Sequence, residues 1–289
     1  MLKKNPVTTK WYADPEARVY NGKLYLYVTR SAPFEMQCNL DILISNDLIE
    51  YERKESILDL KTFSGVECAV WAPTVIEKSG RYYLIFAANN IHSDDEPGGL
   101  YIGVSDNPAG KFSNVFADGR PLLNKIIHGA QPIDAHLFDD DGKIYLYYGG
   151  WGHLNVCVMN DTMDGFVPFS DGQLFREITP DNYVEAPCVF KREGKYYLMY
   201  SSGDWGNGTY AVHYGVSDFP CQRVCDAGVI LSSSDMAGGP GHNGYFQMNG
   251  EYYVAYHRRL IGDKVSYHRL VCVDRLNFDG DKIKPIDMT

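Results

Sequence analysis

The 289-residue sequence lacks long hydrophobic runs and concentrated positive charge. No stretch approaches the ~20 consecutive apolar residues of a membrane helix. The 27 Lys and Arg residues are outnumbered by 37 Asp and Glu residues, which gives a formal net charge of −10, and nowhere do five basic residues cluster. Because a polyanion needs concentrated positive charge, we expect neither nucleic acid nor a membrane as a partner. An acidic chain with 13% aromatic residues better suits a neutral polar ligand.

Cysteine patterns that would suggest a metal or redox site are also missing. The seven cysteines are an odd number, and only Cys221 and Cys225 are close together, without a neighbouring His or Cys to complete a zinc site. Most of the others stand in apolar runs, where a free cysteine behaves as a small hydrophobe. Lys3 and Lys4 are not followed by the apolar stretch of a secretory signal. We therefore expect reduced, buried cysteines in a cytoplasmic protein.

No segment of ten or more residues has a convincing helical periodicity, and the chain instead repeats one pattern five times. Each copy has an apolar strand, a turn ending in glycine, a charged residue and a Tyr-rich strand. Several turns contain Asn-Gly or Asp-Gly, the dipeptides typical of tight hairpins. A third strand then closes on a Ser, Asn or Asp residue. The turn glycines are Gly22, Gly80, Gly142, Gly194 and Gly250, with spacings of 58, 62, 52 and 56 residues.

Repeats of this length that each hold several short strands are typical of a β-propeller. A β-sandwich would not explain why the same pattern returns five times. We therefore predict an all-β fold, a five-bladed β-propeller, forming a single domain over residues 1–289 without an internal linker.

Equivalent positions in the five repeats of a propeller form a ring around its axis. Counting eight residues back from each turn glycine reaches Asp14, Ala72, Asp134, Ala186 and His242. Trp71 and Glu185 directly precede the two alanines. The sequence therefore predicts that three acids, a tryptophan and a histidine meet at one end of the channel: Asp14, Trp71, Asp134, Glu185 and His242.

Converging acids cost stability, and such a cost is usually retained where it serves a function. Glycoside hydrolysis needs one protonated carboxyl for the leaving oxygen and one carboxylate on the opposite side of the sugar. A third carboxylate can keep the acid protonated. Aromatic walls would stack against the apolar faces of a sugar, and we expect Trp71, Trp11 and Phe34 to provide them.

The residues around the predicted ring resemble glycoside hydrolase family 43. The resemblance rests on motifs that occur in order over nearly the whole chain: Trp11-Tyr-Ala-Asp14-Pro, Val70-Trp71-Ala-Pro, Ile133-Asp134-Ala-His, Val184-Glu185-Ala-Pro and Gly241-His242-Asn-Gly. It implies a five-bladed propeller that hydrolyses plant-wall pentosides with inversion. Asp14 would be the general base, Glu185 the general acid, and Asp134 the carboxylate that orients this acid and raises its pKa.

The resemblance also implies ligands in the channel. A calcium ion, held largely through water, would lie near His242, although Asn243-Gly244 departs from the residues that the family often has there. An arginine of the last blade would touch the sugar. We expect Arg269, with Arg258 and Arg259 as alternatives.

The sequence constrains the identity of the sugar and its linkage less than it constrains the type of reaction. We expect no additional C-terminal β-sandwich of the kind that many xylosidases of this family carry. We therefore expect exo-acting release of L-arabinofuranose from arabinan or arabinoxylan oligosaccharides, with a β-D-xylosidase as the alternative. Closure of the groove would depend on the loops at residues 91–99 and 204–209.

Two other readings start from the same motifs. The related β-fructosidases also have Asp-Pro near the start, but they have Arg-Asp-Pro and Glu-Cys where this chain has Ile133-Asp134-Ala135 and Glu185-Ala186. A sugar-binding propeller without catalysis would have no need of three convergent acids, all of which are present here.

Overall fold

The computed structural model describes residues 4–89 and 98–289, and antiparallel hairpins recur along this chain. In each repeat the predicted glycine and the residue before it both have positive φ, for example 51° at Asn21 and 75° at Gly22, as two-residue hairpin turns require. These turns join the first strand of each sheet to the second: β1 (Tyr12–Tyr20) to β2 (Lys23–Arg30), β5 (Val70–Lys78) to β6 (Arg81–Ala88), β9 (His136–Asp140) to β10 (Lys143–Tyr148), β14 (Glu185–Arg192) to β15 (Lys195–Ser202), and β18 (Ala237–Met248) to β19 (Glu251–Leu260).

Further strands extend each hairpin outward into a blade. The sheets have the strand orders β1-β2-β3-β4, β5-β6-β7-β8, β9-β10-β11-β12, β14-β15-β16-β17 and β18-β19-β20, with β13 also paired to β11 and a separate β21-β22 ribbon. The outer strands are β3 (Leu40–Ser45), β4 (Glu52–Lys54), β7 (Gly99–Ser105), β8 (Ser113–Asn114), β11 (Asn155–Met159), β12 (Phe166–Val167), β13 (Phe175–Glu177), β16 (Ala211–Ser217), β17 (Gly228–Leu231), β20 (Leu270–Arg275), β21 (Phe278–Asp279) and β22 (Lys282–Ile283).

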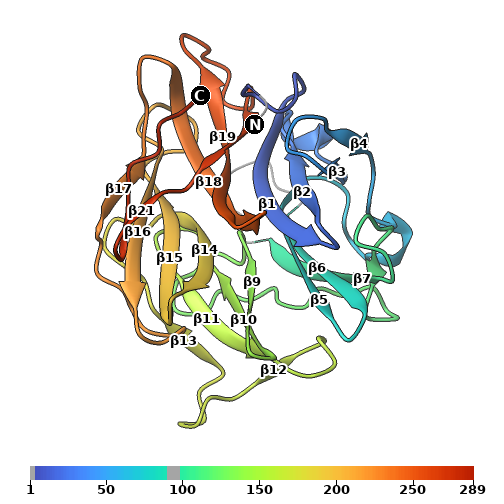
Figure 1. Cartoon of the computed structure of the whole chain (residues 1–289). Coiled ribbons are helices and arrows are strands. Elements are labelled where there is room, and N and C mark those ends of the chain that lie inside the picture. Colours follow the sequence, from blue (N-terminus) through green and yellow to red (C-terminus); the bar gives the residue numbers. More distant parts are fainter. Residues whose placement is uncertain (1–3, 90–97) are drawn as a thin grey trace.

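The blades surround a common axis, with β1, β5, β9, β14 and β18 as successive inner strands (Figure 1). The predicted all-β, five-bladed propeller is therefore confirmed. Helical structure in the described residues is confined to two 3-10 turns, η1 (Phe34–Met36) and η2 (Leu60–Thr62). None of the described helices is long and apolar enough to cross a membrane.

The N-terminal segment closes the ring by completing the last blade. The amide of Val7 donates to the carbonyl of Val271 at 2.9 Å, and the amide of Val273 donates to Asn5 Oδ1 at 2.9 Å. Residues 5–12 thus run beside β20 and supply the outer edge of a sheet that has three strands of its own. Figure 1 shows the consequence, with β1 lying next to β18 and β19.

Hydrophobic clusters fill the interfaces between neighbouring blades and fix the ring geometry. Tyr27 and Phe86 belong to the cluster between the first two blades, and Tyr147 and Tyr200 to the cluster between the third and fourth. All four side chains are completely buried. Because every blade packs on two neighbours, the inner strands are held in a fixed arrangement around the channel.

The cysteines agree only partly with the prediction. All seven are free, but only Cys157, Cys188 and Cys272 are buried. Cys225 is exposed and the other three are partly exposed, since they lie in connections between strands rather than in strand interiors.

Candidate active site

The five ring positions predicted by counting share an unusual backbone conformation. All lie in the left-handed region, which strains an L-residue by roughly 1–2 kcal/mol. In β1, β5, β14 and β18 the hydrogen-bond register also shifts at this point, as at a β-bulge. The φ values are 51° for Asp14, 48° for Ala72, 53° for Asp134, 60° for Ala186 and 44° for His242.

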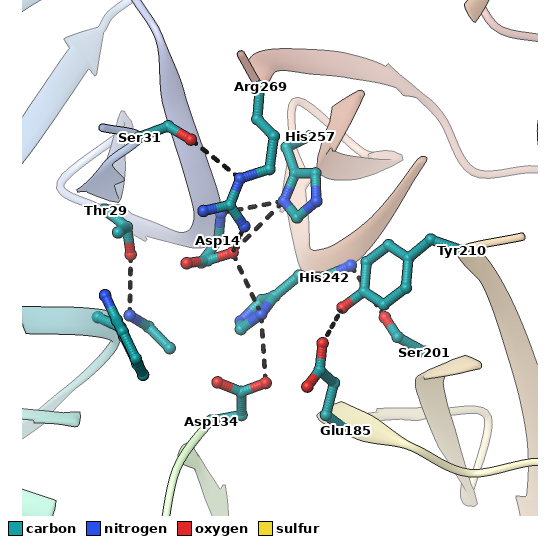
Figure 2. Close-up of polar contacts among 12 residues, drawn as sticks. Asp14, Thr29, Ser31, Asp134, Glu185, Ser201, Tyr210, His242, His257 and Arg269 are labelled. Atoms are coloured by element: carbon teal, nitrogen blue, oxygen red, sulfur yellow. Dashed lines mark hydrogen bonds and ion pairs between the residues drawn. The ribbon is translucent and has the colours of Figure 1, made fainter. Parts of the chain in front are cut away.

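Side chains of the preceding blade hold this strained backbone at three of the five positions. The acceptor in each case comes from the second strand of that blade, seven residues after the turn glycine. Figure 2 shows these contacts around the channel. The acceptors are Thr29 Oγ1 for the amide of Ala72 (2.9 Å), Ser201 Oγ for that of His242 (2.9 Å) and His257 Nδ1 for that of Asp14 (3.2 Å).

The ring opens into a pocket of about 460 Å³, which is the size of a small-ligand site. Asp14, Asp134 and Glu185 all line it, as predicted. Its walls are largely aromatic and apolar, with a few polar groups. The other lining residues are Ala32, Pro33, Phe34, Glu35, Gln37, Trp71, Gln131, Ile133, Trp151, Val184, Trp205, His242, Ser266, Tyr267 and Arg269.

Asp14 is the carboxylate with the most positive surroundings. Arg269 Nη1 lies 3.2 Å from Asp14 Oδ1, and the Nδ1 atoms of His242 and His257 lie at 3.5 and 3.4 Å (Figure 2). Burial alone would raise the pKa of Asp14, but Arg269 and the two histidines outweigh it and hold the pKa well below its ordinary value. Asp14 is therefore ionised at neutral pH.

Asp134 has the opposite electrostatic environment. Burial and the neighbouring charges of Glu185 and Asp14 raise the pKa of Asp134 well above its ordinary value. His242 Nδ1 lies 3.5 Å from Asp134 Oδ2, but burial lowers the pKa of His242, so this imidazole is neutral at pH 7. Because the repulsion between two carboxylates is mutual, Asp134 and Glu185 together retain a proton to higher pH than either would alone.

Glu185 has a buried phenol as its hydrogen-bond partner. The hydroxyl of Tyr210 donates to Glu185 Oε1 at 2.8 Å, and the Tyr210 ring stacks on His257 with centroids 5.7 Å apart. Neither Tyr210 nor His257 is among the residues that we predicted for the site.

Two of the three aromatic residues predicted as walls line the pocket. Phe34 and Trp71 line the pocket with their ring centroids 5.6 Å apart, and Trp71 Nε1 donates to Gln37 Oε1. Trp11 does not line the pocket. Its ring instead stacks on His268, with centroids 4.4 Å apart and an interplanar angle of 7°.

Arg269 is the arginine that reaches the pocket. Besides Asp14, its guanidinium contacts Ser31 Oγ at 2.9 Å and lies 5.3 Å from the ring of Trp205. The two alternatives do not line the pocket, because Arg258 donates to the carbonyl of Thr289 and Arg259 to that of Gly206.

A second buried acid, Glu16, lies two residues further along β1 and outside the pocket lining. Arg18 Nη2 approaches its Oε1 at 2.5 Å and Thr74 Oγ1 donates to the same atom at 3.0 Å. His136 Nδ1 lies 3.6 Å from Oε2. Burial would raise the pKa of Glu16, but Arg18 and His136 outweigh burial and lower it.

Comparison with known proteins identifies the family. The model for glycosyl hydrolases family 43 matches residues 3–283. The chain belongs to this family. It is therefore a glycoside hydrolase, as the sequence motifs predicted.

Relatives of this family-43 chain carry several activities. It is 36% identical to the beta-D-galactofuranosidase xynD of Aspergillus niger, over 99% of this chain and 85% of the relative. It is 27% identical to a beta-xylosidase of Xylanibacter ruminicola, over 97% and 98% of the two chains. Among solved structures, CoXyl43 is a beta-xylosidase/alpha-arabinofuranosidase from a compost metagenome, crystallised with xylotriose in a calcium-free form. It superimposes with a TM-score of 0.81 and 25% identity over 98% and 97% of the two chains.

The described part of this family-43 chain forms no ready-made calcium cage. Calcium takes six to eight oxygen ligands. Within residues 4–89 and 98–289, no three His, Cys, Asp or Glu side chains are arranged to hold a metal ion. Asn243 Oδ1 and His257 Nε2 are among the buried atoms that lack a hydrogen-bond partner in this part of the chain.

Several functional residues escaped sequence reasoning, although part of the signal was present. Counting seven residues forward from each turn glycine, instead of only eight back, would have found Thr29, Ser201 and His257. Trp205 lies in the 204–209 loop, which the sequence singled out for groove closure, and it does line the pocket. The other loop, residues 91–99, falls largely outside the described residues.

Proposed function

We propose that this glycosidase is an inverting, exo-acting enzyme that releases terminal L-arabinofuranose from arabinan or arabinoxylan oligosaccharides. One observation carries the proposal: three carboxyls from three different blades open into a single pocket that Trp71, Trp151 and Trp205 also line. A non-catalytic sugar-binding propeller would gain nothing from the strain and repulsion collected there.

The roles follow from the electrostatics of each carboxyl. Asp14, kept ionised by Arg269, accepts a proton from the water that attacks the anomeric carbon. Glu185 donates its proton to the glycosidic oxygen as the bond between that oxygen and the anomeric carbon breaks. Asp134, buried beside Glu185, disfavours a second negative charge and so keeps this acid protonated until the leaving group takes the proton.

The 36% identical galactofuranosidase favours a second candidate, a β-D-galactofuranosidase. The α-L-arabinofuranosyl and β-D-galactofuranosyl groups have the same ring configuration and differ by one hydroxymethyl group on the exocyclic carbon. A pocket that accepts the first ring would accept the second if that carbon faces open space. The relatives with xylosidase names keep a β-D-xylosidase as the other alternative.

A panel of three 4-nitrophenyl glycosides tests the sugar: α-L-arabinofuranoside, β-D-galactofuranoside and β-D-xylopyranoside. We expect the highest kcat/KM for the arabinofuranoside. A best rate on the galactofuranoside would select the second candidate, and a best rate on the xyloside would reject a furanose pocket. Calorimetric binding of sugar without turnover of any member would instead indicate a binding protein.

Proton NMR during the first minutes of hydrolysis tests the mechanism independently of the sugar. Attack by water from the side opposite to Glu185 inverts the anomeric centre. The first product signal should therefore be that of the inverted anomer. Initial release of the retained anomer would make Asp14 a nucleophile and remove it as general base.

We also propose that calcium binds beside His242 largely through water. Support comes from the unpartnered Asn243 Oδ1, which could accept a hydrogen bond from such water, and His257 Nε2, which could donate one to it. Calorimetric titration of chelator-treated protein with calcium chloride tests this, and a titration without binding heat would reject the ion.

A further inference from the structure

A buried tyrosine hydroxyl is hydrogen-bonded to the carboxyl of Glu185. Tyr210 donates to Glu185 Oε1 at 2.8 Å, while the neighbouring Ser201 Oγ accepts from the amide of His242 at 2.9 Å. Figure 2 shows Ser201, Tyr210 and Glu185 side by side at the edge of the channel.

Elementary chemistry fixes the direction of the hydrogen bond between Tyr210 and Glu185. The phenol hydroxyl has one proton to donate, and a carboxyl oxygen that carries no proton can only accept. Tyr210 therefore donates and Glu185 Oε1 accepts.

The position of Tyr210 is built into the fold. Its side chain is 1% exposed and its ring is nearly parallel to that of His257. Gly241 faces the ring, and a Cβ there would lie 2.1 and 2.2 Å from two ring carbons. The backbone of Gly241 is not in the left-handed region, so its conformation does not require glycine. Glycine is needed there because any side chain would overlap the ring of Tyr210.

We propose that Tyr210 is a positioning residue that fixes which oxygen of Glu185 carries the transferable proton. Because Oε1 accepts from Tyr210, the proton must reside on Oε2. After proton transfer, the same hydrogen bond stabilises the carboxylate that remains. This inference depends on the proposed role of Glu185 as general acid.

Charged and titratable groups around Glu185 set the sign of the expected effect. Asp134 disfavours ionisation of Glu185, whereas a donating Tyr210 favours it, and the buried hydroxyl of Tyr183 lies in the same electrostatic neighbourhood. On the far side of the pocket the charge of Asp14 is compensated by Arg269, with a neutral His242 between. Removal of the Tyr210 hydroxyl should therefore shift the pH profile in the opposite direction to removal of the Asp134 charge.

Tyr210→Phe tests the proposal, with Tyr200→Phe as matched control. Tyr200 is a fully buried tyrosine of the same blade whose hydroxyl donates to the carbonyl of Asp181 rather than to a carboxyl. In Tyr210→Phe the alkaline limb of the pH–rate profile should move to higher pH by about half a unit or more. The rate on an oligosaccharide should fall about tenfold, and that on a dinitrophenyl glycoside much less, because dinitrophenolate needs little protonation. Tyr200→Phe should leave the limb unchanged.

An unmoved alkaline limb in Tyr210→Phe, or a shift of that limb to lower pH, would overturn the proposal.

Glu185→Gln separates failure of this inference from failure of the proposed function. If Glu185 is the acid, this variant should keep far more activity on the dinitrophenyl glycoside than on the oligosaccharide. Equal losses on both substrates would refute the acid itself. A selective loss in Glu185→Gln together with a wild-type profile in Tyr210→Phe would refute only the role of Tyr210.

Discussion

Two buried carboxylate environments lie close together on the propeller axis, and they differ in their partners rather than in their burial. Glu16 and Asp134 are 6% and 7% exposed. Glu16 is bonded to Arg18 and Thr74 and has a lowered pKa, whereas Asp134 faces two other acids and has a raised pKa. Burial therefore does not decide the protonation state of an acid in this channel; the sign of its neighbours does.

The contrast between Glu16 and the pocket acids separates a role in stability from a role in chemistry. Glu16 is satisfied by residues of β1, β5 and the start of β9, so it ties three inner strands together. Among the pocket acids, Asp14 and Asp134 have strained backbone and Glu185 precedes the strained Ala186, and the charge of Glu185 helps to raise the pKa of Asp134. We infer that substitutions at the pocket should change activity first and substitutions at Glu16 should change stability first.

The largest expected effect tests the pocket side of this contrast. Asp14→Asn preserves the shape of the side chain but removes the charge that activates water. Hydrolysis of natural and aryl substrates should fall by at least ~10²–10⁴-fold. The measurement is kcat/KM on both substrates, with thermal unfolding as the check on folding.

An active Asp14→Asn enzyme, within a few-fold of the wild type, would remove Asp14 from the mechanism. A variant that fails to fold would instead show that Asp14 is structural, as Glu16 is, and would break the contrast.

The next largest effect tests the structural side. Glu16→Gln leaves the partly buried Arg18 without its counter-charge, and breaking a buried pair in this way costs about 3 kcal/mol in the free energy of unfolding. Urea denaturation at pH 7 measures it. The pKa of Glu16 is lowered in the folded protein, so its contribution is present above the ordinary pKa of a glutamate and is lost as the pH falls through the folded value.

The difference between wild type and Glu16→Gln should therefore shrink in acid. Activity per folded molecule should change less than tenfold, because Glu16 does not line the pocket. A stable variant with a large loss of kcat would place Glu16 in the catalytic machinery and contradict the separation drawn above.

The sequence predicted which residues lie in the ring better than it predicted which side chains contact them. Counting from the turn glycines located Asp14, Asp134 and His242, because the repeat fixes where each inner strand bends. Counting could not show that Arg269 compensates the charge of Asp14 while Asp134 stays uncompensated, since Arg269 comes from the connection before β20 in the last blade. The same limit explains why Trp11 was expected in the pocket. It is near Asp14 in sequence, but its ring stacks on His268 and does not line the pocket.

Tyr210 shows the other limit of repeat-based reasoning. It directly precedes β16, in a connection between the second and third strands whose length differs from repeat to repeat, so no fixed spacing marks it. Its link to Glu185 depends on the gap left by Gly241 in the neighbouring blade. Contacts of this kind follow from packing between blades and become visible only in three dimensions.

The smallest expected effect gives the sharpest test of the contrast, because activity should fall while stability at neutral pH should rise. Asp134→Asn removes a charge that folding makes unfavourable and keeps the shape of the side chain. With less repulsion, Glu185 loses its proton at lower pH, so the alkaline limb of the pH–rate profile should move down and the rate should fall about tenfold. The pKa of Asp134 is raised in the folded state, so the wild type loses stability as pH rises from the ordinary carboxyl value through the folded one.

Asp134→Asn should therefore match the wild type in stability near pH 3 and exceed it by about 1 kcal/mol at pH 7.5. Calorimetric unfolding at the two pH values measures the difference, and Glu16→Gln is the matched control, with a loss of stability at the higher pH. If Asp134→Asn were instead less stable at pH 7.5, the Asp134 charge would have to be compensated as that of Glu16 is. The pocket would then hold no like-charge repulsion with which to keep Glu185 protonated.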